Sequence, residues 1–247
     1  MKYIESIKNP AVKAWKKLLT KKERDRSGRF LLEGYHLVEE ALKEGLVFEI
    51  IINQEMDKQQ SIKIEGTEVV YVTNEVMKAI CDTETPQGIA AVCEKPSVSF
   101  DKMKVKKLLL LDRVQDPGNL GTLIRTADAA GMDAVILGEG CADPYNPKVV
   151  RSTQGSLFHL PILKTDLAVF FETLDLPIYG TSLEGGVPFE TVEKSDTFAL
   201  LVGNEGQGVA PELLQKTTRN LYIPIHGKCE SLNVGVAAGI LMYYLQK

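Results

Sequence analysis

From residue 106 onward the chain alternates short apolar runs with helical segments, and this alternation limits the folds open to it. The run at 108–111 is four leucines, which is typical of a parallel strand buried on both faces. Strands that alternate with helices favour a mainly parallel sheet covered on both sides, so the sequence predicts an α/β fold. Further strands are expected over 134–137, 160–163, 178–181, 198–202 and 221–225.

The first hundred residues also alternate helix and strand signals, but they end at a polar segment that contains Pro96. We therefore expect a smaller α/β domain at 1–97, a linker at 98–105 and a larger α/β domain at 106–247. The expected helices of the first domain are 10–24, 34–43 and 74–81, and its expected strands are 30–32, 47–52, 69–72 and 89–92.

Composition excludes several classes of protein. The chain has 247 residues, 44% of them hydrophobic, which is enough for a sizeable core. No apolar stretch reaches the ~18 residues of a membrane-spanning helix, and the N-terminus has no apolar signal region. The four cysteines form no Cys-x-x-Cys pair. We therefore expect a cytoplasmic protein with reduced thiols, no membrane segment and no metal site.

The net charge of −4 conceals a basic N-terminus. The first 30 residues carry a balance of +7 and the other 217 carry −11. One interpretation is an arm that binds the backbone of RNA. The alternative is a solvated helix face opposite an apolar side that contains Trp15. The candidate RNA-binding residues are Lys16, Lys17, Lys21, Lys22 and Arg24.

Three polar loops follow expected strands, where ligands bind in a parallel sheet. The first loop, 112–121, leads into a helix that carries Asn119 and Arg125. A helix start with a nearby guanidinium suits a phosphate. The alternative is a Pro-Gly turn with an Asn cap and a surface arginine.

The second loop, 203–208, has the spacing G-x-x-G-x-G rather than the G-x-G-x-x-G of dinucleotide sites. It predicts a loop whose amides approach a ligand closely, with Glu205 orienting a partner; a plain tight turn is the alternative. The third loop ends in Ser231 and Asn233 and leads into the last helix. We expect Ser231 or a neighbour to cap this helix, and its small residues to allow close backbone approach.

Taken together and in this order, the three loops resemble the three motifs of the SpoU family of RNA ribose 2'-O-methyltransferases, which belongs to the SPOUT class. The resemblance runs from about Leu108 to Gln246. A weaker resemblance to the substrate-binding domain that many family members carry covers 30–34 and 85–90.

The resemblance implies a trefoil-knotted, mainly parallel α/β sheet, a homodimer formed through the knotted domain, and S-adenosylmethionine as cofactor. It places a catalytic group at Asn119, Arg125, Glu205, Ser231 and Asn233. It places the cofactor against Thr181, Gly203, Ile223 and Leu232. One departure is Gly235, where the family often has Ser.

The chemistry of methyl transfer fits these residue types. A sulfonium methyl is already activated, so the protein mainly aligns the attacking ribose 2'-OH and stabilises its alkoxide character. A guanidinium does not lose its proton, so we expect Arg125 to clamp an RNA phosphate. Asn119 and Glu205 would hold Arg125 and the ribose in place.

Three functions follow from these observations. The preferred one is ribose methylation of ribosomal RNA, 23S in particular, with transfer RNA as the alternative substrate. The second is an RNA-binding protein that has lost chemistry, against which the complete catalytic set argues. The third, a nicotinamide-dependent oxidoreductase, is disfavoured by the spacing and position of loop 203–208.

Overall fold

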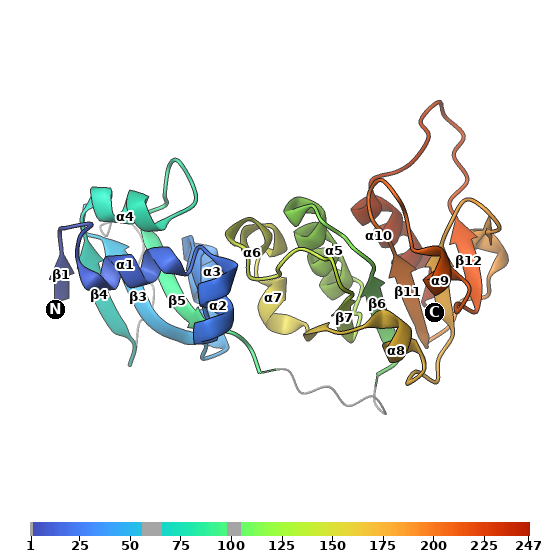
Figure 1. Cartoon of the computed structure of the whole chain (residues 1–247), viewed down its shortest axis with the longest axis horizontal. Helices are drawn as coiled ribbons and strands as arrows, with labels where there is room; N and C mark the ends of the chain where they lie inside the picture. The colour runs from blue at the N-terminus through green and yellow to red at the C-terminus, as the bar shows by residue number, and fades with distance from the viewer. Residues whose placement is uncertain (1, 56–65, 98–104) are drawn as a thin grey trace. The chain divides into compact units, whose positions relative to one another are not determined.

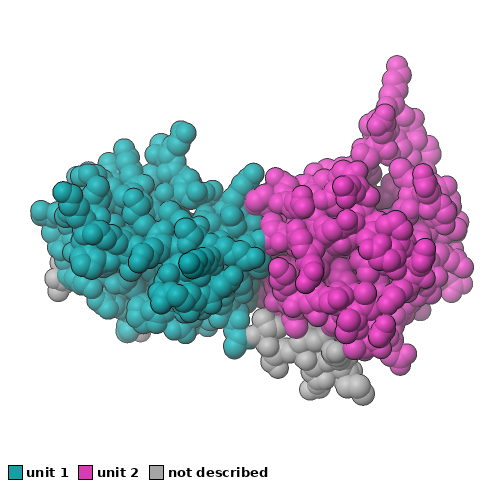
Figure 2. Space-filling model, in the orientation of Figure 1, with its two compact units in different colours: residues 1–97, 143–158 teal, residues 98–142, 159–247 magenta. Residues whose placement is uncertain are grey.

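The computed structural model describes residues 2–55, 66–97 and 105–247, and the chain forms two compact units. Unit 1 comprises residues 1–97 and 143–158, and unit 2 comprises residues 98–142 and 159–247 (Figures 1 and 2). The predicted linker, 98–105, lies outside the described residues except for Val105. Residues 143–158, which the sequence analysis included in the second domain, therefore pack with unit 1.

Unit 1 contains a five-stranded mixed sheet in the order β1-β4-β3-β5-β2. β1 and β3 pair parallel to β4, while β5 runs antiparallel to both β3 and β2. Helices α1 and α4 cover one face through an apolar cluster that contains Val12, Trp15 and Val76. The elements are β1 (Lys2–Ile4), α1 (Pro10–Lys17), α2 (Lys21–Ser27), β2 (Arg29–Glu33), α3 (Tyr35–Lys43), β3 (Val47–Asn53), β4 (Glu68–Val72), α4 (Asn74–Ile80) and β5 (Ile89–Glu94).

The single helix predicted over 10–24 is wrong, because the chain forms α1 and α2 instead. Asn9 caps α1 by accepting from the Ala11 amide, and a proline stands at the first helical position. Thr20, just before α2, has extended backbone angles (φ −96°, ψ 138°). The two helices are therefore separate elements, which the charge pattern alone did not indicate.

Residues 143–158 complete unit 1 with α6 (Pro147–Thr153) and most of α7 (Ser156–His159). The Phe30 ring of β2 lies 5.1 Å from the Tyr145 ring and 6.4 Å from the Phe158 ring, measured between centroids. Arg151 donates to the Asp82 carboxylate at 2.9 Å. These contacts join residues far apart in sequence, which local periodicity does not report.

Unit 2 contains a seven-stranded sheet in the order β10-β12-β9-β11-β6-β7-β8, and every pairing in it is parallel. This confirms the predicted parallel α/β fold. The strands are β6 (Lys107–Leu111), β7 (Ala134–Leu137), β8 (Ile162–Lys164), β9 (Ile178–Thr181), β10 (Val187–Pro188), β11 (Phe198–Val202) and β12 (Arg219–Tyr222). The short β10 was not predicted, and β12 ends before Ile223 rather than at Ile225.

Helices cover both faces of this sheet, which explains why β11 and β7 are apolar at every position and β6 is apolar from Leu108 on. α8 (Leu167–Phe171) and α9 (Pro211–Leu214) pack on one face through an apolar cluster that includes Leu108 and Leu201. α5 (Pro117–Ala129) contacts β7 and α10 (Val234–Leu245) contacts β11. Within the described residues, no helix is both long enough and apolar enough to cross a membrane.

α10 lies close against α5 because its contact positions are glycines. A Cβ atom on Gly235 would lie 2.9 Å from Thr122 Cγ2, and one on Gly239 would lie 3.2 Å from Thr126 Cγ2. The small side chains of the last helix therefore allow the close approach that the sequence predicted. Gly235, the one departure from the family pattern noted in the sequence, lies at this contact.

Candidate functional site

The site lies at the carboxyl edge of the parallel sheet of unit 2. β6 lies between β11 and β7 in the sheet. The next strands along the chain, β7 and β8, lie on one side of β6, and the later strands β9, β11 and β12 lie on its other side. Such a reversal of strand order opens a crevice at the strand ends, where ligands bind in open α/β sheets. The loops after β6 and β11 flank this position.

A chain of hydrogen bonds joins the three predicted loops. Asn233 Nδ2 donates to Asn119 Oδ1 at 2.9 Å, and Asn119 Nδ2 donates to Glu205 Oε1 at 3.1 Å. These two hydrogen bonds fix the orientation of the Asn119 side-chain amide, because its oxygen accepts from Asn233 and its nitrogen donates to Glu205. The structure thus brings Asn119, Glu205 and Asn233 together from sequence positions 86 and 114 residues apart.

Glu205 also holds the start of α5. Its carboxylate accepts from the Asp116 amide at 3.2 Å and from the Gln115 amide at 3.4 Å. Burial raises the pKa of Glu205, but the bonds from Asn119 and from these backbone amides outweigh it and lower the pKa below its ordinary value. Glu205 is therefore an ionised acceptor and a poor base, which suits it to orienting a partner.

Two helices begin at this cluster. Asp116 caps α5 by accepting from the Asn119 amide at 2.8 Å, and Asn233 caps α10 by accepting from the Gly235 amide at 2.9 Å. The cap of α5 is therefore Asp116 and not Asn119, which the alternative interpretation of that loop had named, and the cap of α10 is Asn233, a near neighbour of Ser231. The positive ends of two helix dipoles meet here, which favours a negatively charged group.

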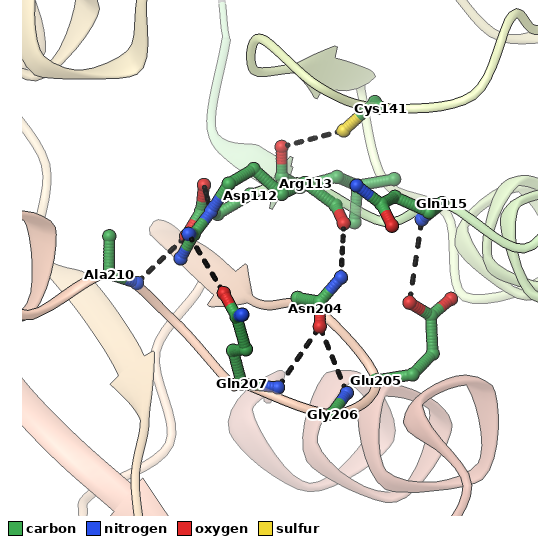
Figure 3. Close-up of polar contacts among 10 residues, drawn as sticks. Asp112, Arg113, Gln115, Cys141, Asn204, Glu205, Gly206, Gln207 and Ala210 are labelled. Atoms are coloured by element: carbon green, nitrogen blue, oxygen red, sulfur yellow. Dashed lines mark hydrogen bonds and ion pairs between the residues drawn. The ribbon is translucent and has the colours of Figure 1, made fainter.

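The loop after β11 is held in shape by Asn204 (Figure 3). Asn204 Oδ1 accepts from the amides of Gly206 and Gln207, and its Nδ2 donates to the Arg113 carbonyl at 3.0 Å. Gly203 is required at the base of the loop, since a Cβ there would lie 2.2 Å from the Gly208 carbonyl carbon. The loop therefore presents Glu205 from a fixed backbone.

Arg125 and Ser231 do not join the hydrogen-bonded cluster. Arg125 is exposed at the ninth position of α5 rather than near its start, and no hydrogen bond or ion pair holds it within the part of the chain that is described. Ser231 is exposed in the segment between β12 and α10, which extends away from the body of unit 2 (Figure 1). Both side chains are free to meet a ligand.

Three of the predicted cofactor residues lie at adjacent strand ends. Thr181 ends β9, Gly203 follows β11 and Ile223 follows β12, and these strands are neighbours in the sheet. The loops that follow β9 and β12 also expose Leu183 and Leu232, whose side chains are 65% and 37% exposed. Exposed apolar side chains at neighbouring strand ends are the kind of surface that a flat aromatic ring such as adenine packs against.

The basic residues of unit 1 separate into two groups. Lys16, Lys17, Lys21 and Lys22 are exposed. Arg24 is only 2% exposed, because its guanidinium donates to Asp143 at 3.0 and 2.6 Å and to the Leu18 carbonyl at 2.8 Å. The structure therefore corrects the assignment of Arg24 as an RNA contact.

Sequence reasoning missed the residues that support the cluster. Asp116 stands directly before Pro117, and this pair is a signature of a helix start that could have identified it as the cap. The buried Asp112 accepts from the Ala210 amide at 2.8 Å and so ties the loop after β6 to the end of the loop after β11. No local signal in the sequence indicates that contact.

An all-parallel sheet that gathers polar side chains from three loops at one edge is typical of ligand-binding α/β proteins. The chain belongs to the SpoU rRNA methylase family, which matches residues 106–243, and residues 9–91 match the MRM3-like substrate binding domain. The family expected from the sequence is thus confirmed, and the trefoil knot is implied by membership of it.

Characterised relatives and solved structures resemble the whole chain. It is 51% identical to the 23S rRNA (guanosine(2553)-2'-O)-methyltransferase RlmP of Bacillus subtilis, over 100% of both chains. The AdoMet-bound rRNA methyltransferase from Sinorhizobium meliloti superposes with a TM-score of 0.87 at 33% identity, covering 99% of this chain and 97% of that one. The SpoU methyltransferase AviRb from Streptomyces viridochromogenes, also bound to AdoMet, gives 0.84 at 27% identity, covering 96% and 97%.

Proposed function

We propose that this protein transfers the methyl group of S-adenosylmethionine to a ribose 2'-OH of 23S ribosomal RNA, and that the target is a guanosine. The observation that carries the proposal is the bonded cluster of Asn119, Glu205 and Asn233 at the strand edge. The specificity of RlmP, which matches this chain from end to end, supports the choice of RNA and of nucleoside. Ribosomal RNA as substrate supports action in the cytoplasm.

S-adenosylmethionine supplies a methyl group that is already activated by its sulfonium, so the protein residues act by positioning. The strand ends at Thr181, Gly203 and Ile223, with Leu232, hold the cofactor. Asn119 is held rigid by Asn233 and Glu205, and it positions the ribose for in-line attack. Ser231 helps to position the same sugar.

The 2'-oxygen attacks the methyl carbon and releases its proton to solvent water, and the site is built to stabilise the negative charge that the oxygen develops. Arg125 binds the adjacent phosphate and stabilises the developing alkoxide, because a guanidinium remains charged throughout. The N-termini of α5 and α10 add positive potential on the same side. Glu205 remains ionised and orients Asn119 rather than accepting the proton.

The first test is methyl transfer itself. Tritiated S-adenosylmethionine with unmodified 23S rRNA should give label that survives as a 2'-O-methyl guanosine after nuclease digestion. Methyl transfer to tRNA and not to 23S rRNA would show that tRNA is the substrate. Tight RNA binding without any transfer would show that the protein binds RNA but is not a methyltransferase. A transcript in which the target carries a 2'-deoxyribose is the matched control and should accept no label, since it lacks the attacking hydroxyl.

We also propose that two copies associate through α10. This helix is apolar on all sides, yet Val236, Ile240 and Tyr243 are 52%, 39% and 55% exposed. These positions are four and three residues apart and so share one face of the helix. A helix that is apolar all round is normally buried on all sides, and a second copy would cover this face.

The dimer can be tested by sedimentation equilibrium. We expect twice the 27.3 kDa mass of one chain for the wild type, and the mass of one chain for Ile240→Asp, because a carboxylate in an apolar interface is costly to desolvate. Val169→Asp, at a 59% exposed position of α8, is the matched control and should remain dimeric. A wild-type protein that sediments as one chain at micromolar concentration contradicts this part of the proposal.

Unit 1 would grip the RNA through the exposed lysines of α1 and α2. Replacing Lys16, Lys17, Lys21 and Lys22 with Gln should weaken RNA binding and reduce the slope of log Kd against log salt by about 0.7–0.9 for each phosphate that is no longer neutralised. Filter binding at several salt concentrations measures both quantities. Lys43→Gln with Lys78→Gln, on α3 and α4 of the same unit, removes two charges and is compared with Lys16→Gln/Lys17→Gln, which removes the same number from α1. An unchanged slope in the fourfold variant would leave α1 and α2 as ordinary solvated helices.

A further inference from the structure

Arg113 directly follows the buried Asp112 after β6, and its backbone is held in a conformation that arginine rarely adopts. Its φ is 54°, and within the described residues only one other non-glycine residue, Gln154 with φ 51°, shares this feature. Strain of this kind persists only where surrounding contacts enforce it, and it gathers at functional sites. The positive φ of Arg113 therefore suggests that its side chain has a role at this position.

The guanidinium of Arg113 is fixed between two loops of the site (Figure 3). Its Nε and Nη2 donate to Asp112 Oδ1 and Oδ2, each at 3.1 Å, and its Nη1 donates to Gln207 Oε1 at 3.4 Å. The side-chain stem packs closely over Gly140, where an added Cβ would lie only 3.0 Å from Arg113 Cγ. Arg113 is thus a preorganised fork that joins the loops after β6 and β11.

This fork keeps hydrogen-bonding capacity that the protein does not use. A guanidinium has five N–H donors, and the contacts above use three of them. The side chain is 35% exposed, whereas its partner Asp112 is 5% exposed. Two N–H groups of Arg113 bond to Asp112 and neutralise its charge, and a third bonds to Gln207. The remaining two N–H groups have no partner among the described residues.

We propose that Arg113 binds a phosphate oxygen of the RNA beside the target ribose, which makes it a further substrate-binding residue. The proposal rests on the proposed function. An oxyanion is the ligand that matches a fixed guanidinium, and both RNA phosphates and the carboxylate of S-adenosylmethionine supply one. The phosphate is favoured because Arg113 follows β6, on the far side of β11 from β9 and β12, whose ends carry the proposed cofactor residues Thr181 and Ile223.

The test separates RNA binding from the neutralisation of Asp112. In Asp112→Asn the buried charge is gone, while the new side chain can still accept from the Ala210 amide. Asp112→Asn is then compared with the double variant Asp112→Asn/Arg113→Gly, in which glycine also relieves the positive φ. The dissociation constants for a 23S rRNA transcript and for S-adenosylmethionine are measured for both variants at several salt concentrations.

We expect the double variant to bind the transcript about tenfold or more weakly than Asp112→Asn, because it lacks one charge-assisted hydrogen bond to the RNA. The slope of log Kd against log salt should fall by the amount expected for about one phosphate contact. The dissociation constant for S-adenosylmethionine should not change. Gln154→Gly relieves the same backbone strain in unit 1 and should bind the transcript as the wild type does.

Two outcomes overturn the proposal. Equal transcript binding in the two variants would mean that Arg113 only balances Asp112, and weaker cofactor binding with unchanged RNA binding would assign it to the carboxylate. Because these are binding measurements, they decide the role of Arg113 even if the wild type transfers no methyl group, the result that would contradict the proposed function.

Discussion

Arg125→Ala will lower methyl transfer to RNA by about 100- to 1,000-fold, the loss expected when one group that stabilises transition-state charge is removed. The side chain is exposed and has no partner within the described residues, so its removal leaves no group of the fold unsatisfied. Binding of S-adenosylmethionine should stay within about twofold of the wild type, since the proposed cofactor residues lie on other loops. Single-turnover transfer and equilibrium binding of the cofactor measure the two quantities separately.

Arg125→Lys is the matched control for that experiment. Lysine keeps the positive charge but not the planar fork, so transfer should fall between those of the wild type and Arg125→Ala. Thermal unfolding of both variants should match the wild type, because α5 keeps its cap and its buried face. Wild-type turnover in Arg125→Ala would remove Arg125 from the site, and equal loss of cofactor binding would assign it to the cofactor instead.

The sequence predicted those parts of the fold that have a local period. The leucines at 108–111 marked β6 as a central strand because all of them are buried between two layers of helices. The glycines of the last helix indicated close packing, and Gly235 and Gly239 do lie against Thr122 and Thr126. Each of these features is visible within a few residues of sequence.

The parts that escaped prediction depend on contacts between distant residues. The sequence predicts Arg24 to be exposed like the other cations of the basic run. In the folded chain it is buried because it pairs with Asp143, which lies 119 positions away. The order of the strands, which places the loops after β6 and β11 side by side, is likewise set by long-range pairing. The resemblance to the family identified Asn119, Glu205 and Asn233, whereas Asp112 and Asn204 belong to the supporting contacts, which no local pattern records.

Arg24→Ala should destabilise the folded protein more than any of the other substitutions proposed above. The guanidinium is 2% exposed, and its removal takes the donors away from Oδ2 of Asp143, whose side chain is 10% exposed, and from the Leu18 carbonyl. Breaking a buried ion pair by removing one partner typically costs about 3–5 kcal/mol. Because Asp143 belongs to the segment 143–158 that packs on unit 1, that segment should also lose protection in hydrogen exchange.

Chemical unfolding and hydrogen exchange measure the two effects, and the same helix supplies the control. Arg26 is an exposed cation on α2 that pairs with Glu23 three residues away, so Arg26→Ala should change neither quantity appreciably. The double variant Arg24→Met/Asp143→Asn removes both charges and keeps an acceptor for the Tyr145 amide, so it should recover much of the lost stability. If Arg24→Ala unfolds with wild-type stability, the buried pair of Arg24 and Asp143 does not stabilise the packing of residues 143–158 in unit 1.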